Sequence, residues 1–157
     1  GLIDAHTHIP MTLFRGLADD LPLHTWLEQH VWPAEHRFIN PETVKWASRL
    51  GGAELLRSGV TTLCDMYFYE DEVATAVDDL GLRGVLAQAF FDVTASRDFD
   101  LERSFTDAEQ FVARWRDHPR IVPVLGPHAP YTVGPELYRR PARARGAAGY
   151  PCRHPFG

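Results

Sequence analysis

The chain has 157 residues, of which 45% are hydrophobic, and this length and composition suit a globular domain with its own core. Its net charge of −5 comes from acidic residues spread along the chain, so we expect neither nucleic acid nor a membrane surface as a partner. Cys64 and Cys152 are far apart and predict no disulfide framework, which favours a cytoplasmic setting. We also expect no targeting or membrane-spanning segment, because no apolar run is long enough.

Short apolar runs alternate with amphipathic stretches along the chain. The runs predict four strands, at residues 2–5, 60–64, 85–91 and 121–125. The amphipathic stretches predict helices that start and stop at recognisable signals. The first helix is expected from Asn40-Pro41 to Gly59, the second over residues 70–80, and the third from a capping box at Thr106 to the stop at His118. A fourth helix is expected after Gly134-Pro135.

Strict alternation of strand and helix predicts an α/β fold with a parallel sheet. Four such βα units are the first half of an eightfold barrel of the TIM type, which typically needs about 250 residues, so the barrel would be incomplete. An open doubly wound sheet is the alternative. The connection over residues 11–39 is unusually long for a βα unit, and connections of this kind are often functional.

The composition changes sharply at residue 139. Residues 139–157 contain no Val, Ile, Leu or Met, and five of the nineteen are Arg. No strand can be built there, although a fifth strand is due. We therefore divide the chain into a partial barrel over residues 1–138 and an aberrant tail over residues 139–157. Out-of-frame translation of GC-rich DNA typically yields a composition rich in Arg, Ala, Pro and Gly. Our hypothesis is therefore a frameshift near residue 140, and a flexible basic tail is the alternative.

His6 and His8 lie at the end of the first predicted strand. Residues i and i+2 of a strand point to the same face, so both imidazoles can approach one ion. Neutral imidazole nitrogen suits Zn, Fe, Ni or Co, and a catalytic site needs further ligands. A pair of polar residues without a metal is the alternative, but the carboxyl end of a barrel strand is where such enzymes place their sites.

The sequence also carries a family resemblance. The opening GLIDAHTHIPMTLFRGLADDLPLHTWLEQHVWPAE resembles the amidohydrolase superfamily, in its branch of cytosine- and adenosine-type deaminases and triazine hydrolases. Within that branch it is most similar to the S-adenosylhomocysteine/5'-methylthioadenosine deaminases. The stretches LLRSGVTTLCDMYFYED, LGLRGVLAQAFFD and VPVLGPHAPYTVGPEL agree in order and spacing. The resemblance covers residues 1 to about 138, and it implies that Gly1 is an internal position.

The resemblance implies roles for particular residues. His6 and His8 match two ligands of one divalent metal ion, Zn or alternatively Fe. Glu35 matches a glutamate that contacts ribose hydroxyls, and carboxylate oxygens suit that task. His128 matches a substrate-contacting histidine near the metal, whereas Asp65 is interpreted as structural, ordering the neighbouring loops. No role is matched by the other histidines, which are His24, His30, His36, His118 and His154.

The implied function is metal-dependent hydrolytic deamination of an adenosine-type substrate such as 5'-methylthioadenosine or S-adenosylhomocysteine. Alternatives are hydrolysis of a triazine, deamination of cytosine or guanine, or a truncated chain without catalysis. Gln88 stands near a position where some members carry an arginine for the substrate's carboxylate, which puts S-adenosylhomocysteine itself in doubt. The family's third metal histidine, its catalytic glutamate, a later histidine and a metal-binding aspartate have no counterpart here, so we expect this chain alone to be inactive. A purine nucleoside-like small molecule is the expected partner, and the oligomeric state is left open.

Overall fold

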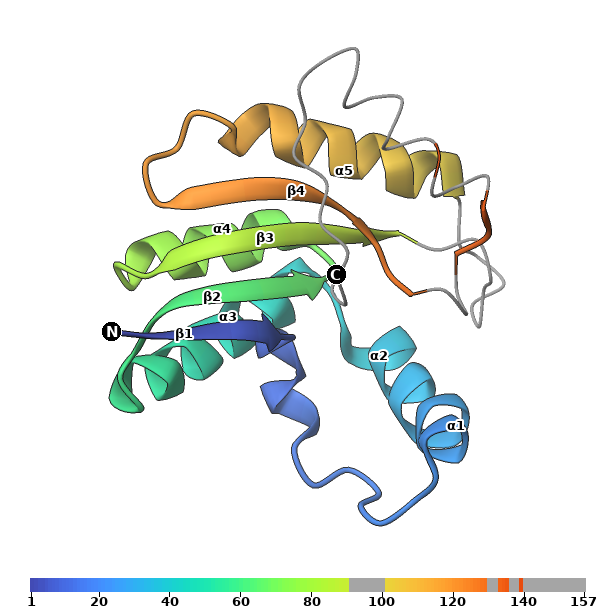
Figure 1. Cartoon of the computed structure of the whole chain (residues 1–157). Coiled ribbons are helices and arrows are strands. Elements are labelled where there is room, and N and C mark those ends of the chain that lie inside the picture. Colours follow the sequence, from blue (N-terminus) through green and yellow to red (C-terminus); the bar gives the residue numbers. More distant parts are fainter. Residues whose placement is uncertain (91–100, 130–132, 136–138, 140–157) are drawn as a thin grey trace.

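Four parallel strands form the centre of the computed structural model, which describes residues 1–90, 101–129, 133–135 and 139. The four predicted strands are confirmed, and each is extended by a few residues. Their bounds are β1 Leu2–Thr7, β2 Val60–Tyr67, β3 Arg83–Phe90 and β4 Ile121–Pro127. All of them point their carboxyl ends toward the side of the molecule where α2 (Trp32–Phe38) lies (Figure 1).

The strands follow one another across the sheet in the order β1-β2-β3-β4. Each neighbouring pair is parallel, with Thr7 opposite Asp65 at the end of β1 and β2. A doubly wound sheet reverses its strand order at a switch point, whereas a barrel adds each strand beside the last. The sheet is therefore the opening half of a βα barrel, as predicted, and the doubly wound alternative is wrong.

Three long helices connect consecutive strands (Figure 1). They are α3 Pro41–Arg57, α4 Glu70–Asp79 and α5 Leu101–Trp115. The predicted start of α3 is confirmed, because Asn40 Oδ1 accepts a hydrogen bond from Thr43 N at 3.0 Å and Asn40 N donates to Thr43 Oγ1 at the same distance. Its predicted end is also confirmed, since Gly59 follows with φ of 84°.

The predicted start of α5 is wrong. This helix begins at Leu101, and the Thr106 hydroxyl donates to Glu102 O at 2.8 Å within the helix instead of capping its first turn. Phe105 supplies the physical reason, because its ring packs edge-on against Phe90 of β3 at a centroid distance of 5.5 Å. This tertiary contact stabilises helical structure that precedes Thr106, so the helix does not begin at the predicted capping box.

Two consecutive glycines allow α3 to approach its neighbours closely. A β-carbon on Gly51 would lie 2.9 Å from Ile9 O, in the 3₁₀ helix η1 (Ile9–Phe14), and one on Gly52 would lie 2.6 Å from Leu80 Cδ1. Glycine usually weakens a helix interior, so these positions exchange helix propensity for close packing. The contact at Gly51 sets the path of the chain just after the histidine pair.

The long first connection contains the turn η1 and then one unbroken helical stretch over residues 23–38, whose middle part is π-helical. After η1 the chain continues through α1 Leu23–Trp26, the π-helical segment η2 Leu27–Val31, and α2. Trp26 Nε1 donates to Leu17 O at 2.9 Å and so ties α1 back to the preceding loop. Among the described residues, the main contacts of α2 are with η2, the preceding turn of the same stretch, and Glu35 connects α2 to β2 through a hydrogen bond with Tyr67.

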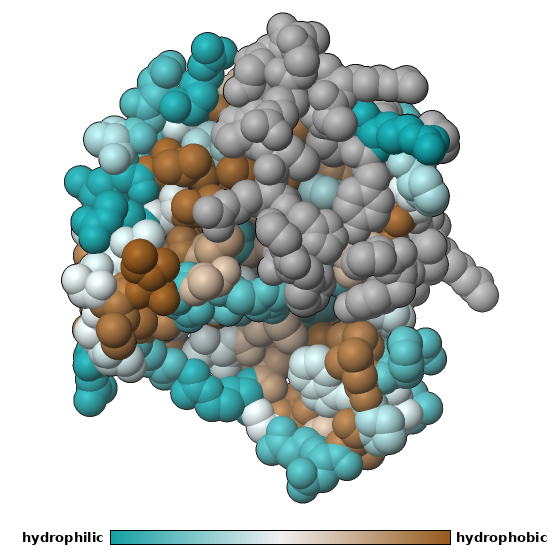
Figure 2. All heavy atoms as spheres, in the orientation of Figure 1, coloured by the Kyte–Doolittle hydropathy of each residue, from teal (hydrophilic) through white to brown (hydrophobic). Residues whose placement is uncertain are grey.

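The main core lies between the sheet and its helices, with a smaller cluster on the other side of the sheet around Met66, Ala87 and Val124. Apolar surface is exposed at the amino-terminal ends of the strands (Figure 2). Leu2 and Ile3 of the edge strand β1 are 63% and 72% exposed. These residues lie on the edge against which the last strand of a complete barrel would close, whereas further strands would be added beside β4.

Some expectations fall outside the described residues. These are the last residue of the third predicted strand, Phe91, most of the helix expected after Gly134-Pro135, and nearly all of the 139–157 tail with Cys152 and His154. Within the part of the chain that the structure does describe, every helix is too short or too polar to cross a bilayer.

Candidate functional site

The histidine pair lies where β1 ends and η1 begins. Its two imidazole rings stand edge-on, with centroids 5.0 Å apart and an interplanar angle of 83°. His8 Nδ1 lies 2.6 Å from the Met66 carbonyl oxygen at the end of β2. Because a carbonyl only accepts, Nδ1 carries the proton and Nε2 is the atom with a lone pair for another partner. A metal-binding histidine typically has its second nitrogen held in this way.

Electrostatics keep the His8 ring neutral. Burial lowers its pKa, the hydrogen bond to Met66 O opposes this effect, and the neighbouring His6 lowers the pKa further. A neutral imidazole is the form that binds a metal ion. The local backbone is fixed as well, since Ile9 N donates to Asp65 Oδ1 at 2.6 Å immediately after the pair.

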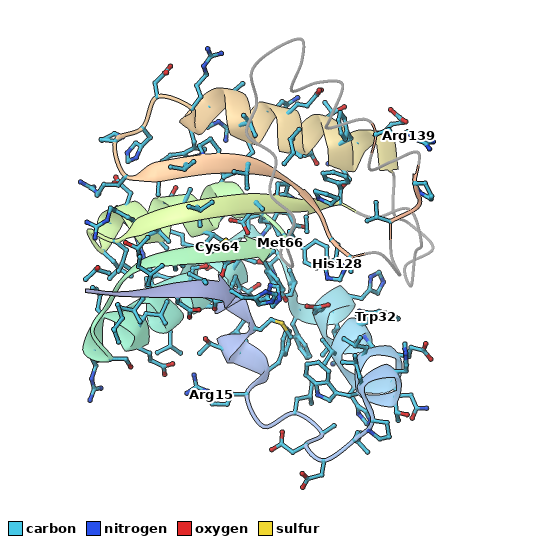
Figure 3. The ribbon with its side chains drawn as sticks, in the orientation of Figure 1. Arg15, Trp32, Cys64, Met66, His128 and Arg139 are labelled. Carbon is cyan, nitrogen blue, oxygen red and sulfur yellow. The ribbon has the colours of Figure 1, made fainter. Side chains whose placement is uncertain are left out.

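His128 lies at the end of β4, at the other edge of the sheet from the histidine pair. It follows β4, and its backbone N donates to Phe90 O at 3.2 Å. Burial, and then the proximity of His8 and His6, lower its pKa to about 4. Figure 3 shows His128 beside Met66, on the side of the molecule where α2 lies. The structure therefore brings three predicted site residues, His6, His8 and His128, into one region.

The described residues do not complete a metal shell. Among them, no group of three or more His, Cys, Asp or Glu side chains could hold a metal ion. His128 is thus close enough to influence the pair electrostatically without joining it as a ligand. Two imidazoles fit Zn²⁺ or Fe²⁺ by their donor chemistry, and a catalytic site needs at least one more protein ligand.

Glu35 lies on α2 and is tied to the sheet. Its Oε1 accepts a hydrogen bond of 2.6 Å from the Tyr67 hydroxyl at the end of β2. Burial raises the pKa of Glu35, and the hydrogen bond from Tyr67 acts in the opposite direction. The carboxylate is therefore held at the same edge of the sheet as the histidines.

Sequence reasoning missed a buried acid pair behind the site. Asp65 and Glu70 are 1% and 0% exposed, and their carboxyl groups lie close enough to influence each other's pKa. Asp65 Oδ1 accepts from Ile9 N, and Glu70 Oε1 accepts from Tyr67 N at 2.6 Å. Their outer oxygens, Oδ2 and Oε2, meet no N–H or O–H donor among the described residues.

We expect the pair to share a proton between the two outer oxygens, because two ionised carboxylates have no hydrogen to donate. Burial raises the pKa of both groups, and each carboxyl is further influenced by the other. Asp65 orders the neighbouring connections, as expected, and Glu70 does so with it. The available signal in the sequence was two acids five residues apart around a strand end, which is too common a pattern to predict the contact.

Gln88 belongs to the same network. Its Oε1 accepts a hydrogen bond of 3.0 Å from Glu70 N at the first turn of α4. An uncharged amide in this role presents no cation to a substrate carboxylate. Tyr69, just before α4, adopts the left-handed conformation with φ of 55°, so the turn between β2 and α4 is a strained one.

The remaining features lie away from this region. His118 stands near the opposite end of the sheet, where its Nε2 is 3.4 Å from Asp78 Oδ1. A cavity of about 510 Å³ opens between η1 and α1, and none of the four candidate residues lines it.

Comparisons with known proteins agree with this geometry. The sequence pattern of the Amidohydrolase family matches residues 1–145. The chain is 46% identical over 140 residues to 5-methylthioadenosine/S-adenosylhomocysteine deaminase of Syntrophobacter fumaroxidans. It is 49% identical over 142 residues to 5'-deoxyadenosine deaminase of Methanocaldococcus jannaschii. The two alignments cover 89% and 87% of this chain but 32% of each relative, so the chain spans about a third of their length.

Solved structures show the same relationship. A zinc-bound adenosine deaminase from Xanthomonas campestris superposes with a TM-score of 0.91 and 38% identity, over 98% of this chain and 35% of that protein. The zinc complex of atrazine chlorohydrolase TrzN from Arthrobacter aurescens shares the fold, with a TM-score of 0.84 and 21% identity over 98% of this chain and 40% of that one. Together with the match over residues 1–145, these similarities show that the chain belongs to the amidohydrolase family.

Proposed function

We propose that this chain carries the first two metal ligands and part of the substrate site of a metal-dependent deaminase acting on an adenosine-type nucleoside. The observation that carries the proposal is the half-buried His8 ring, whose Nδ1 is held by Met66 O so that Nε2 can bind an ion beside His6. The names of the relatives, 5-methylthioadenosine/S-adenosylhomocysteine deaminase and 5'-deoxyadenosine deaminase, support the substrate class.

The ion would be Zn²⁺, as in the zinc-bound adenosine deaminase, with Fe²⁺ as the alternative. When bound, it would supply Lewis acidity and lower the pKa of the water that attacks the amino-bearing carbon of the ring. His6 and His8 would hold it from β1. His128, kept neutral by burial, would contact the heterocycle as a hydrogen-bonding group, and Glu35 would accept from the ribose hydroxyls.

We further propose that the 157-residue chain has no turnover by itself, because proton transfer to the leaving ammonia needs groups that the resemblance assigns to later strands. A small-molecule substrate and a cytoplasmic setting complete the proposal, the latter supported by the absence of a disulfide framework. The Gln88 side chain accepts a hydrogen bond from Glu70 N and carries no positive charge. This favours substrates without a carboxylate, such as 5'-methylthioadenosine.

Metal binding to the purified chain tests the proposal most directly. In calorimetric titrations with Zn²⁺, we expect His6→Ala and His8→Ala each to weaken binding at least about tenfold. His24→Ala, on the exposed part of α1, is the matched control and should leave the affinity unchanged. Equal losses in all three variants, or no Zn²⁺ binding by the unmodified chain, would contradict the metal site. Ammonia release from 5'-methylthioadenosine by the chain alone would contradict the proposed lack of turnover.

A further inference from the structure

Tyr67 connects the core of the fold to the long first connection. The residue closes β2, is 5% exposed, and belongs to the core between sheet and helices. Its ring also packs edge-on against Phe68 at a centroid distance of 5.2 Å. At its far end the hydroxyl donates to Glu35 Oε1 at 2.6 Å. The side chain is thus anchored in the core and ends on a residue of the proposed substrate site.

The helix that carries Glu35 needs such a link. α2 is the last part of the helical stretch over residues 23–38, and among the described part of the chain its main contacts are with η2, the preceding turn of that stretch. Figure 1 shows α1 and α2 standing away from the sheet. A helix that makes few contacts with the sheet does not by itself fix a side chain relative to the strands within the tolerance that a binding site requires. The hydrogen bond from Tyr67 supplies a fixed point on the strand.

The chemistry of the contact also suits an acceptor site. Burial, and then the nearby Glu35 carboxylate, raise the pKa of the Tyr67 phenol, so the hydroxyl stays protonated and donates. Its hydrogen bond opposes the effect of burial on Glu35 and favours the ionised carboxylate. An ionised carboxylate has lone pairs at both oxygens and can accept from two adjacent hydroxyl groups while Tyr67 occupies one position on Oε1.

We propose that Tyr67 is a positioning residue that orients the Glu35 carboxylate to accept hydrogen bonds from the vicinal hydroxyls of a ribose-bearing substrate. This inference rests on the proposed function, and it adds a residue that acts only through Glu35. Tyr67→Phe removes the hydroxyl and keeps the ring in the core. Tyr69→Phe is the matched control, because its ring lies two residues further along and is exposed.

The test is calorimetric binding of 5'-methylthioadenosine, and separately of 2',3'-dideoxyadenosine, to the Zn²⁺-saturated 157-residue chain. We expect Tyr67→Phe to weaken 5'-methylthioadenosine binding about tenfold, the usual effect of losing a hydrogen bond that orients a charged group. Binding of the dideoxy nucleoside, which lacks the hydroxyls, should be unchanged, as should Zn²⁺ affinity. Tyr69→Phe should leave all three affinities as they are.

The outcomes separate this inference from the proposed function. Equal weakening of both nucleosides by Tyr67→Phe would show a general structural defect and overturn the positioning role. Unchanged binding of both nucleosides would overturn it too, while leaving the proposed function in place. If the unmodified chain binds neither nucleoside, the proposed function fails and the inference fails with it. A carboxyl NMR titration adds a readout without ligand, since the pKa of Glu35 should rise in Tyr67→Phe and stay constant in Tyr69→Phe.

Discussion

Replacing both buried acids by amides, in Asp65→Asn/Glu70→Gln, is expected to destabilise the chain far more than either replacement alone. In Glu70→Gln, the amide Nε2 takes the place of the protonated oxygen and donates to Asp65, while Oε1 still accepts from Tyr67 N. Asp65→Asn reproduces the opposite arrangement, with Oδ1 still accepting from Ile9 N. Each single variant therefore keeps every hydrogen bond of the pair.

The double variant cannot do so. If both amide oxygens accept from the backbone, two NH₂ groups face each other, and if one amide flips, an NH₂ faces a backbone N–H. At least one buried polar contact is lost in either case, at a cost of about 1–3 kcal/mol. We expect each single variant to stay within about 1 kcal/mol of the unmodified chain at pH 7, with a coupling of about 1–3 kcal/mol in the double variant.

Urea unfolding followed by tryptophan fluorescence gives the free energies for this double-mutant cycle. The exposed neighbours Asp19 and Asp20 offer a matched control, because Asp19→Asn/Asp20→Asn removes two adjacent acids at the surface and should be additive. Additivity within about 0.5 kcal/mol at Asp65 and Glu70 would refute the shared proton. A single amide variant that loses as much stability as the double variant would refute it equally.

Three further outcomes are expected. Burial raises the pKa of Asp65 from 3.8 to about 7, so between these pH values the native state holds the shared proton that the unfolded chain releases. The free energy of unfolding should therefore fall as pH rises from 4 to 7, by at most about 1.4 kcal/mol per pH unit and proton. Urea unfolding should show a flatter pH profile in Glu70→Gln, and an unchanged profile would count against the shared proton. Gly51→Ala should lower the free energy of unfolding by about 1–3 kcal/mol, because its β-carbon would meet Ile9 O. Gly52→Ala should lower it less, because its β-carbon would meet only the flexible end of the Leu80 side chain, and thermal unfolding can compare the two variants. If residues 139–157 arise from a frameshift, the DNA beyond codon 140 should encode an apolar strand with a histidine in another reading frame. A resequenced gene with an unbroken reading frame, together with an intact mass that matches the 157 residues, would contradict the frameshift.

Local sequence signals were sufficient for the elements whose stability is local or strongly patterned. The four strands are apolar runs, and the signals at Asn40 and Gly59 satisfy the ends of α3 by themselves. The beginning of α5 was predicted wrongly, because a capping box at Thr106 is only a local preference. The packing of Phe105 on Phe90 outweighs it, and that contact joins residues from different elements.

The residues of the candidate site also differ in whether local sequence was enough to predict them. His6 and His8 could be named from the sequence because both lie on one short strand, and the period of that strand puts them on one face. Glu35 and His128 were named through a family resemblance, since nothing in their local sequence relates them to β1. Only the folded chain shows that Tyr67 reaches Glu35 and that Met66 O orients His8.

The sequence by itself thus determined the fold class, the order of the βα units and the family, because hydrophobic period, turn signals and motif spacing are properties of short segments. The tertiary structure decided how the site is supported. Asp65, Tyr67 and Glu70 are ordinary residues along the chain, and they become a buried unit that holds the backbone only once β2 is covered. The physical reason is desolvation: a carboxyl group in water makes no demand on its neighbours, whereas a buried one must find a donor among them.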